Sequence, residues 1–458
     1  MADASDIPGS TRRSFLAGTL SAPLLRSAPQ ADRPNVLVIV LDDLGCHDLG
    51  YLGASDLKTP NIDALAERGL KFRNWYSNAP VCAPARSAIL TGRFPALAGV
   101  RDNGPALAHG IPTIASVLKG AGYRTGCIGK WHLGSAEETA PTGHGFDYFY
   151  GFHSGCVDYF SHRYYWGEPR VPNYHDLWRN RTEIFEDGRY LTERITEEAA
   201  DWISRNREDP FFAYIAYNAP HYPMHAPGKY KERLSGLAPE RQTYGAMIAA
   251  VDDGIGQLRR TLESAGMAGN TLIFFLGDNG ATVEKRAGLN GDFATAGSNG
   301  VFKGFKFSLF DGGMHVPGFV SWPARIRRGS WTSELAMSMD ILPTICRATG
   351  ATLPRQVNGS DILDTIVSGA PSPHKSLYWS QSGQLATRRG PWKLVVNGRL
   401  YDRRPDGTKP LEGEDAIWLS NLDEDPGETR NLRRLHASVV DELLTDLYRW
   451  RDTLPKPE

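Results

Sequence analysis

Four short apolar runs, each followed by polar residues, constrain the fold of this 458-residue chain more than any other feature. The runs cover Asn35–Leu41, Thr125–Ile128, Phe211–Tyr217 and Thr271–Leu276. Nearly continuous apolar runs of this length are typical of strands buried on both faces of a parallel sheet. Helical patterns at 61–68, 111–119 and 191–205 lie between them. The alternation predicts an α/β fold with a large, mostly parallel sheet flanked by helices.

The C-terminal part of the chain has a different pattern. Short candidate strands lie close together at 377–379, 384–387, 392–396 and 400–401. This spacing predicts a smaller antiparallel sheet, and the pattern of 438–450 predicts a helix with one apolar face. The expected parts of the chain are an export signal and linker over 1–32, a large domain with the catalytic site over 33–355, and a smaller α+β domain over 356–458.

The N-terminal residues have the pattern of a targeting segment. Arg12 and Arg13 precede a short, weakly apolar stretch at 15–25. Paired arginines followed by Phe-Leu resemble a twin-arginine export signal, with small residues at 27–28 where cleavage can occur. This interpretation predicts export of the folded protein to the periplasm or the cell exterior. The alternative is a disordered tail that contains Arg-Arg by chance.

Charge and cysteine content exclude several classes of function. The chain has 51 Lys+Arg and 52 Asp+Glu, a net charge of −1, which gives no electrostatic reason to expect nucleic acid or an anionic membrane as partner. No apolar run reaches the roughly 18 residues that span a bilayer. The 5 cysteines contain no Cys-x-x-Cys pair, so a fold built on disulfides is excluded.

Polar residues follow the predicted strands at the ends where ligands bind. In an open parallel sheet, ligands bind beyond the carboxyl ends of the strands. The residues expected at this edge are Asp42, Asp43, Lys130, His132, His221, Asp278 and Asn279. One such cluster alone is typical of a turn or a helix cap. Four clusters at one edge indicate a functional site.

Part of this set has the chemistry of a metal site. The residues that offer only oxygen ligands are Asp42, Asp43, Asp278 and Asn279. Oxygen-rich sites suit Ca²⁺ or Mg²⁺ better than zinc, which prefers thiolate and imidazole. An anionic substrate beside these acids needs added positive charge, and Lys130 and Arg86 can supply it.

The segment 79–93 places a cysteine at the start of a predicted helix. Pro84 is typical of a first helical turn, so Cys82 is expected just before the exposed N–H groups of the helix. Arg86 lies one turn further on and can reach back towards position 82. Three interpretations of Cys82 remain open from these residues alone: a buried inert cysteine, a thiolate nucleophile, and a site of modification.

The third interpretation rests on a resemblance. Cys82-x-Pro-x-Arg followed by Thr91-Gly-Arg93 resembles the signature of the type I sulfatases, in which the cysteine is oxidised to formylglycine. Further segments match that family in the same order: Leu41–Gly45, Thr59–Phe72, Gly129–Gly134, Gly145–Gly151, Ala219–Pro223, Gly277–Gly280 and Asp425–Thr429. The resemblance covers most of the chain from Asn35 to Leu432. It implies the alkaline phosphatase-like sulfatase fold and a formylglycine-generating enzyme as a partner during maturation.

The resemblance also implies a mechanism for sulfate ester hydrolysis. Hydrated formylglycine 82 attacks sulfur and forms a covalent sulfate intermediate beside a divalent cation, Ca²⁺ or Mg²⁺. The implied roles are charge neutralisation for Lys130 and Lys306, support of the diol for Arg86, protonation of the leaving alcohol for His221, and removal of the diol proton for His132. The implied metal ligands are Asp42, Asp43, Asp278 and Asn279.

The segment around Lys306 departs from the family pattern. Lys306 falls on the catalytic lysine by its spacing to Asp311-Gly-Gly, and Lys303 is a nearby competitor. The family usually has Glu where this chain has Asp311 and Arg where it has His315. We expect these two departures to affect the substrate side of the site.

The substrate is predicted from a segment rich in aromatic residues at 151–166, which includes Asp158. Such groups stack on sugar rings, and the segment loosely resembles relatives that act on sulfated amino sugars, so a small sulfated carbohydrate is favoured over an aryl sulfate. The alternative is a loop packed over the domain. Two alternative functions are a phosphomonoester or phosphonate hydrolase on the same scaffold and, if Cys82 is unmodified, a catalytically silent glycan-binding protein.

Overall fold

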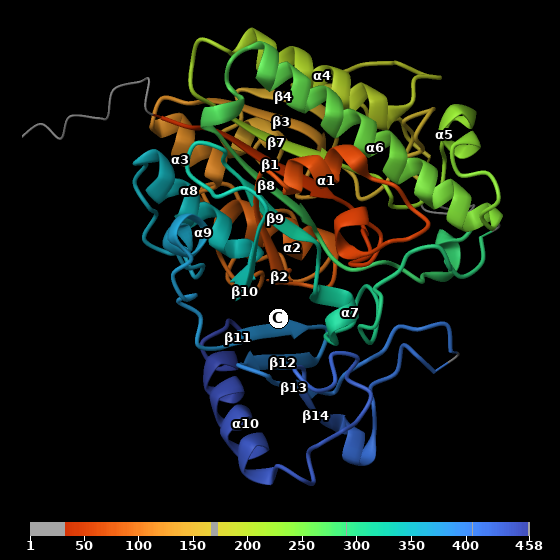
Figure 1. The fold of residues 1–458 in the computed structure, drawn as a ribbon, viewed down its shortest axis with the longest axis vertical. Helices are drawn as coiled ribbons and strands as arrows, with labels where there is room; N and C mark the ends of the chain where they lie inside the picture. Colours follow the sequence, from red (N-terminus) through yellow and green to blue (C-terminus); the bar gives the residue numbers. More distant parts are fainter. Residues whose placement is uncertain (1–32, 166–172, 290, 405, 457–458) are drawn as a thin grey trace, which may run out of the picture.

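A large mixed sheet forms the centre of the computed structural model, which describes residues 33–165, 173–289, 291–404 and 406–456. The predicted export signal at 1–32 lies outside the described residues. In the described part of the chain, this sheet has ten strands in the order β10-β2-β9-β8-β1-β7-β3-β4-β5-β6, and a separate sheet of four strands lies beside it (Figure 1). The expected α/β architecture with a smaller C-terminal sheet is confirmed.

The strands of the large sheet include all four that the sequence predicts. They are β1 Asn35–Leu41, β2 Gly69–Tyr76, β3 Arg124–Lys130, β4 Tyr148–Phe152, β5 Trp178–Arg179, β6 Thr182–Glu183, β7 Phe211–Tyr217, β8 Thr271–Gly277, β9 Gly318–Ser321 and β10 Ser330–Met337. The central strands β8, β1, β7, β3 and β4 are parallel. Strand β9 runs antiparallel to both of its neighbours, β8 and β2.

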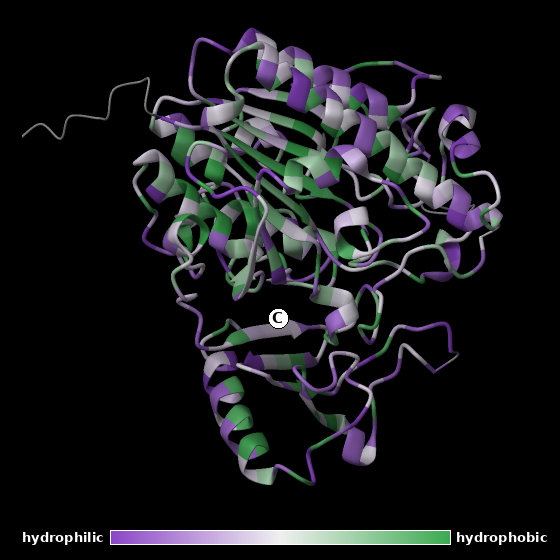
Figure 2. Cartoon of the chain, in the orientation of Figure 1, coloured by the Kyte–Doolittle hydropathy of each residue, from purple (hydrophilic) through white to green (hydrophobic). Residues whose placement is uncertain are grey.

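Helices cover both faces of this sheet (Figures 1 and 2). The helices that precede the smaller sheet in the chain are α1 Pro60–Ala66, α2 Cys82–Thr91, α3 Ile114–Gly120, α4 Leu191–Arg205, α5 Gly228–Glu232, α6 Pro239–Ser264, α7 Asp311–Met314, α8 Ile341–Thr349 and α9 Leu363–Ser368. Short 3₁₀ turns occur at Gly50–Leu52, Pro141–His144, Ala268–Asn270, Lys285–Ala287, Ser338–Asp340 and Gly413–Ala416. Among the described helices, none is long and apolar enough to cross a bilayer.

The apolar run of β1 feeds two separate cores because successive side chains point to opposite faces. Leu37, Ile39 and Leu41 pack with residues of α1, α4 and α6. Val36, Val38 and Val40 pack with residues of α2, α3, α8 and α9 on the other face. Both faces of the central strands are therefore buried, which is why their sequences are apolar without alternation. The predicted domain boundary at 355/356 stays a prediction.

The smaller sheet differs from expectation in its last strand. Its strands are β11 Leu377–Gln381, β12 Gln384–Arg389, β13 Trp392–Val396 and β14 Ile417–Asn421, and α10 Ala437–Arg451 packs Val440, Leu443 and Leu447 against it. The predicted strand at 400–401 is wrong. Tyr401 has a φ of 49° and its N–H donates to the carbonyl of Gly407 at 2.8 Å, so this segment turns back on itself instead of extending the sheet.

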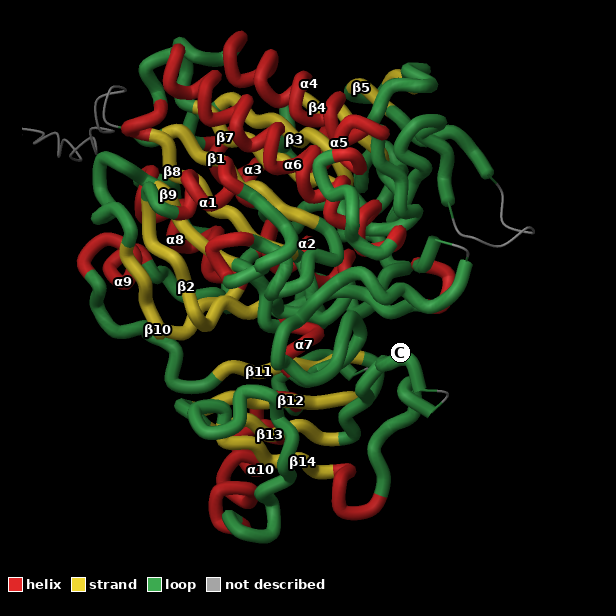
Figure 3. The backbone as a smooth tube through the Cα atoms, turned by 45° about the vertical axis from the view of Figure 1, so that its right-hand side comes forward, coloured by secondary structure: helices red, strands yellow, loops and turns green. Residues whose placement is uncertain are grey.

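A buried ionic cluster joins the two sheets, with α7 between them (Figures 1 and 3). Lys393 of β13 places Nζ 2.5 Å from Asp311 Oδ1 and 3.3 Å from Glu428 Oε1. The N–H of Asp311 donates to Glu428 Oε2 at 2.7 Å, and Tyr76 Oη donates to Asp311 Oδ2 at 2.8 Å. Burial opposes ionisation of Asp311, yet Lys393 holds its pKa below the usual range. The cluster therefore remains charged although water is excluded from it.

Replacement of Lys393 tests the importance of this cluster. We expect Lys393→Met to lower the free energy of unfolding by about 3–5 kcal/mol, because it leaves the buried carboxylates of Asp311 and Glu428 without their cation. Urea unfolding followed by tryptophan fluorescence measures the change. The matched control is Arg389→Gln, which removes an exposed pair with Glu442 and should cost under about 1 kcal/mol. Equal effects of the two variants would contradict the argument.

Candidate active site

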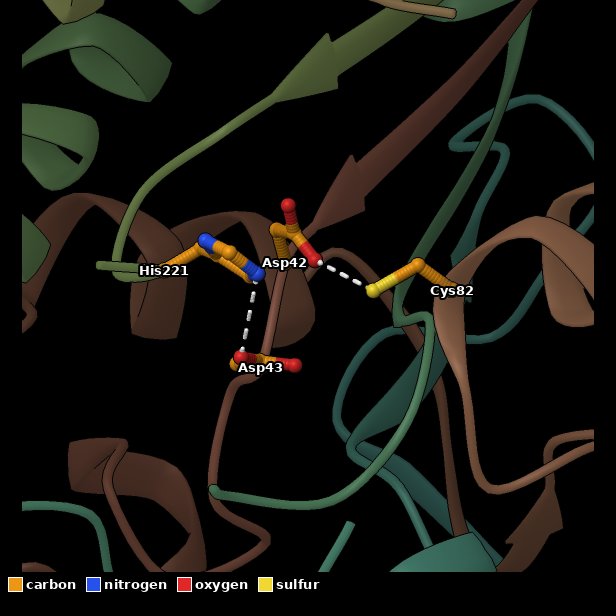
Figure 4. Close-up of side chains that lie close together, drawn as sticks. All are labelled: Asp42, Asp43, Cys82 and His221. Atoms are coloured by element: carbon orange, nitrogen blue, oxygen red, sulfur yellow. Dashed lines mark hydrogen bonds and ion pairs between the residues drawn. The ribbon is translucent and has the colours of Figure 1, made fainter. Parts of the chain in front are cut away.

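Four adjacent parallel strands end at one edge of the large sheet and bring the predicted site residues together. Strand β1 leads to Asp42, β3 ends at Lys130, β7 leads to His221 and β8 leads to Asp278. Their order in the sheet is β8-β1-β7-β3, so no other strand separates them. Helix α2 begins with Cys82 at the same edge. In Figure 4 the side chains of Asp42, Asp43, Cys82 and His221 converge on a common point.

The acidic residues of this edge are completely enclosed. Asp42, Asp43, Asp278 and Asn279 are each at most 1% exposed. Asn279 Nδ2 donates to Asp43 Oδ1 at 2.7 Å, and the N–H of Asp43 donates to Asp278 Oδ1 at 3.1 Å. Asp43 has a φ of 58°, which the surrounding hydrogen bonds hold in place. Two strand ends are thus joined directly through their acidic side chains.

Three buried cations balance these acids. Arg86 Nη2 donates to Asp278 Oδ2 at 2.8 Å, and its Nη1 donates to the carbonyl of Lys130 at 3.2 Å. Lys130 Nζ lies 2.5 Å from Asp42 Oδ2, and Lys306 Nζ lies 3.0 Å from Asp43 Oδ2. The closest contact of Arg86 is therefore with Asp278 and not with Cys82.

Although cations lie beside all three acids, the pKa values of Asp42, Asp43 and Asp278 differ. Burial, followed by the charges of Asp42 and other acids, raises the pKa of Asp43 to about 7 and that of Asp278 to about 6. Burial also opposes ionisation of Asp42, but Lys130, His221 and Arg86 hold its pKa well below the usual range. A further positive charge beside Asp43 and Asp278 would therefore stabilise their ionised forms.

The arrangement fits a divalent cation in two further respects. Asn279 Oδ1 is buried and has no hydrogen-bond partner among the described residues. Potential ligand atoms of Asp42, Asp43, Cys82 and His221 lie within 4.8 Å of one another. An unsatisfied amide oxygen beside buried carboxylates is typical of a site for a hard cation. Asn279 and the three carboxylates can hold such an ion.

Cys82 is buried beside this acidic set. Its Sγ lies 3.2 Å from Asp42 Oδ1 (Figure 4). Burial and the charge of Asp42 raise the pKa of the Cys82 thiol well above its ordinary value. The thiolate hypothesis for position 82 is therefore disfavoured by its surroundings. All five cysteines of the chain are described, and each is buried and free.

The two histidines differ in what their nitrogens contact. His221 Nδ1 lies 2.6 Å from the carbonyl of Tyr222, which can only accept, so Nδ1 carries the proton and Nε2 is an acceptor. Lys306 Nζ lies 3.3 Å from that Nε2. Burial, followed by the charge of Lys130, holds the pKa of His132 well below its usual value. His132 is therefore neutral and able to accept a proton.

A cavity of about 560 Å³ opens over these groups. Cys82, His132, His221 and Lys306 all contribute to its wall. The aromatic segment divides between the cavity wall and the interior: His153, Ser154 and Tyr164 line the cavity, whereas Val157, Tyr159 and His162 are buried in the fold. Trp166 lies outside the described residues. Asp158 accepts from the N–H groups of Phe160 and Ser161 and shapes the loop.

Three residues near Lys306 lie outside the cavity. Asp311 and His315 do not reach the cavity; they belong to the cluster between the two sheets, where His315 stacks on Tyr76 at 4.9 Å and bonds the carbonyl of Arg73. The expectation that they affect the substrate side is wrong, because Asp311 is held by Lys393 instead. Lys303 also lies there, with Nζ 3.0 Å from the carbonyl of Glu428.

Several residues of the cavity wall were not predicted. They include Asn103, Asp176, Trp178, Glu284, Arg286 and Phe307. Glu284 Oε2 lies 3.3 Å from Lys306 Nζ, and Glu284 Oε1 pairs with Arg286 at 2.9 Å. The only sequence signal for Glu284 and Arg286 is their position shortly after Asn279, which is too weak to identify them.

Comparisons with known proteins agree with this geometry. The family model described as Sulfatase matches residues 34–351. N-acetylgalactosamine-6-sulfatase of Sus scrofa is 32% identical over 391 residues, which cover 80% of this chain and 72% of that protein. Arylsulfatase J of Mus musculus is 30% identical over 469 residues, which cover 92% of this chain and 76% of that protein.

Solved structures show the same similarity across both sheets. The structure of Ps i-CgsB in complex with k-i-k-neocarrahexaose has a TM-score of 0.81 and 28% identity, and the match covers 93% of this chain and 94% of that one. The chain therefore belongs to the sulfatase family and is a sulfuric ester hydrolase with the alkaline phosphatase-like fold.

Proposed function

We propose that this enzyme hydrolyses a sulfate ester on a sulfated carbohydrate, using formylglycine made from Cys82 and a bound Ca²⁺, with Mg²⁺ as the alternative ion. The observation that carries the proposal is the position of Cys82, in the cavity wall, at the first residue of α2 and 3.2 Å from Asp42. The curated relative that acts on N-acetylgalactosamine 6-sulfate supports a carbohydrate as substrate.

Two groups would complete the site. A cation held by Asp42, Asp43, Asp278 and Asn279 supplies positive charge that polarises sulfate oxygens. A hydrated aldehyde at position 82 would supply one hydroxyl, ionised beside the cation, to take the sulfuryl group as the sulfur–oxygen bond of the ester breaks, and a second hydroxyl to allow the release of sulfate. The formylglycine-generating enzyme is the partner that this proposal requires during maturation. The signal at 1–32 is consistent with export of the finished enzyme to the periplasm or beyond.

The lysines and Arg86 neutralise negative charge during the reaction. Lys130 Nζ and Lys306 Nζ are bonded to Asp42 and Asp43 respectively. Their ammonium groups can stabilise the sulfuryl oxygens as charge develops there. Arg86 fixes Asp278 and the end of β3, so it keeps the charged framework in place around position 82.

The proton for the leaving oxygen comes from the pair of Lys306 and His221. The unprotonated Nε2 of His221 faces the Lys306 ammonium at 3.3 Å, so the proton is held at Nζ and can pass through Nε2. As the sulfur–oxygen bond of the ester breaks, the leaving alkoxide takes this proton. His132, which is neutral, accepts the proton of the second hydroxyl when the aldehyde forms again and sulfate leaves.

The first test of the proposed function concerns position 82. Peptide mass analysis of active enzyme should find an aldehyde in place of the Cys82 thiol, and Cys82→Ala should lower kcat for sulfate esters by more than about 1000-fold because the nucleophile is lost. Cys127→Ala, which changes a buried cysteine of the core, is the control and should keep the activity. Full activity of enzyme with an unmodified thiol would refute the proposal, and faster hydrolysis of phosphate than sulfate esters would favour a phosphatase.

The second prediction concerns the cation. Asp43 and Asp278 have raised pKa values of about 7 and about 6, and both must lose their protons to hold an ion. Ca²⁺ should therefore bind about tenfold or more tightly at about pH 8 than at about pH 5, with protons released on binding. Calorimetry in buffers of different ionisation enthalpy measures both effects.

A matched pair of variants separates the site from the rest of the protein. Asn279→Ala should weaken Ca²⁺ binding, because it removes the unsatisfied Oδ1. Asn74→Ala removes an amide that bonds the carbonyl of Ser333 far from the site and should leave binding unchanged. Binding of Ca²⁺ that is independent of pH and of Asn279 would show that the ion lies elsewhere.

A further inference from the structure

A second cavity, of about 680 Å³, lies directly beside the catalytic one. Glu284, Arg286, Lys306 and Phe307 line both cavities. Phe307 follows the catalytic lysine directly, so its ring lies where the two spaces meet. The two cavities are therefore neighbours, the first lined by Cys82 and the second by residues next to the smaller sheet.

The far wall of the second cavity comes from the C-terminal part of the chain. Arg399, Tyr401 and Asp402 line it, together with Ser382 from the turn between β11 and β12. The catalytic side of the chain supplies Val283 and Asp102. This cavity therefore lies between the two parts of the protein, whereas the residues with roles in hydrolysis all come from the larger part.

One buried glutamine fixes both walls. Gln384 of β12 is fully buried, and its Nε2 donates to the carbonyl of Phe307 at 2.8 Å. Its Oε1 accepts from the N–H of Arg399 at 3.0 Å and from the N–H of Leu309 at 3.3 Å. Gln384 thus bonds both the loop that follows Lys306 and the loop that carries Arg399, so both walls of the cavity are tied to β12.

The cavity presents aromatic surfaces that suit a sugar ring. The rings of Phe307 and Tyr401 have centroids 5.3 Å apart and are inclined at 42°. Both residues have positive φ angles, 73° and 49°, a conformation that bulky residues rarely adopt. Such outliers cluster where a side chain must be held in a functional position. Aromatic faces with a few polar groups are typical of ligand pockets.

The charges of the second cavity favour an anionic ligand. Arg399 Nη1 donates to Tyr401 Oη at 3.3 Å, its Nε is buried without a hydrogen-bond partner, and no ion pair of Arg399 is found within the described residues. Asp402 is neutralised by Arg404 at 2.7 Å. The lining has four basic residues, Lys285, Arg286, Lys306 and Arg399, against three acidic ones, Asp102, Glu284 and Asp402. A guanidinium with an unused donor is suited to sulfate or carboxylate.

We propose that this second cavity is a binding site for another sugar ring of the substrate, one that carries a sulfate or carboxylate group, next to the ring whose sulfate lies over position 82. The inference rests on the proposed function and extends it: the substrate is an anionic oligosaccharide, and the C-terminal part of the chain contributes to its selection. The ring stacks on Tyr401 and Phe307, and its anionic group pairs with Arg399.

The test compares substrates of increasing length. Release of sulfate is measured from 4-nitrophenyl sulfate, from N-acetylgalactosamine 6-sulfate, and from sulfated chondroitin and carrageenan oligosaccharides of two to six sugars. We expect kcat/KM for at least one oligosaccharide to exceed that for the single sugar. Tyr401→Ala and Arg399→Gln should each lower the ratio of oligosaccharide to single-sugar kcat/KM about tenfold. Tyr448→Ala and Arg449→Gln on α10 are the matched controls and should leave the ratio unchanged.

The outcomes separate this inference from the proposed function. Single sugars hydrolysed as well as every oligosaccharide, or a ratio that Tyr401→Ala and Arg399→Gln both leave unchanged, would overturn the second binding site while hydrolysis stands. If no sulfate ester is hydrolysed, the proposed function fails. Calorimetry of the same oligosaccharides then decides the inference, because weaker binding by both variants than by the α10 controls supports the site, and equal binding overturns it.

Discussion

The mutual neutralisation of buried charges at the end of four parallel strands is the constraint on which the rest of this structure depends. Asp42 and Asp278 are fully enclosed, and carboxylates in such a place are costly unless cations meet them there. Arg86 and Lys130 come from α2 and β3, so the acids of β1 and β8 are stable only when α2 packs against the same edge. That requirement also fixes Cys82, the first residue of α2. The cations that the buried acids of this sheet edge require thus also place Cys82 beside them.

A second buried ionic cluster, formed by Asp311, Lys393 and Glu428, positions the segment that carries Lys306. The segment 303–311 contacts the C-terminal part of the chain at both ends: Lys303 bonds the carbonyl of Glu428 in the loop after β14, and Asp311 pairs with Lys393 of β13. Lys306 lies between these two anchors and points to Asp43. The C-terminal part of the chain therefore holds Lys306 in place although it supplies no residue to the acidic set. Asp311 and His315, which depart from the family pattern, lie in the ionic cluster between the two sheets, where Asp311 pairs with Lys393.

The parts that sequence could predict are those with a local pattern. Apolar runs that feed two cores identified β1, β3, β7 and β8, and the polar residues after each run identified the site edge, because both features are contained within a few consecutive residues. The strand at 400–401 was wrong because two apolar residues do not reveal that Tyr401 adopts a positive φ. Lys393 and Glu428 were missed because their partner Asp311 is distant in the chain, and such a pair leaves no periodic signal. Glu284 and Arg286 were also missed, because they reach the cavity only through the folded position of their loop.

The electrostatics of the site explain why a modified residue suits position 82 better than a thiol. A thiol must lose a proton to become a nucleophile, and beside Asp42 in a buried position that loss is disfavoured, as the raised pKa of Cys82 shows. An aldehyde has no proton to lose and carries no charge, so it is compatible with the same acidic surroundings. The proposed hydrate would have two hydroxyl groups, and Lys306 and His132 line the cavity into which they would project. The negative charge that raises the pKa of the Cys82 thiol would thus also hold the proposed cation beside that hydrate.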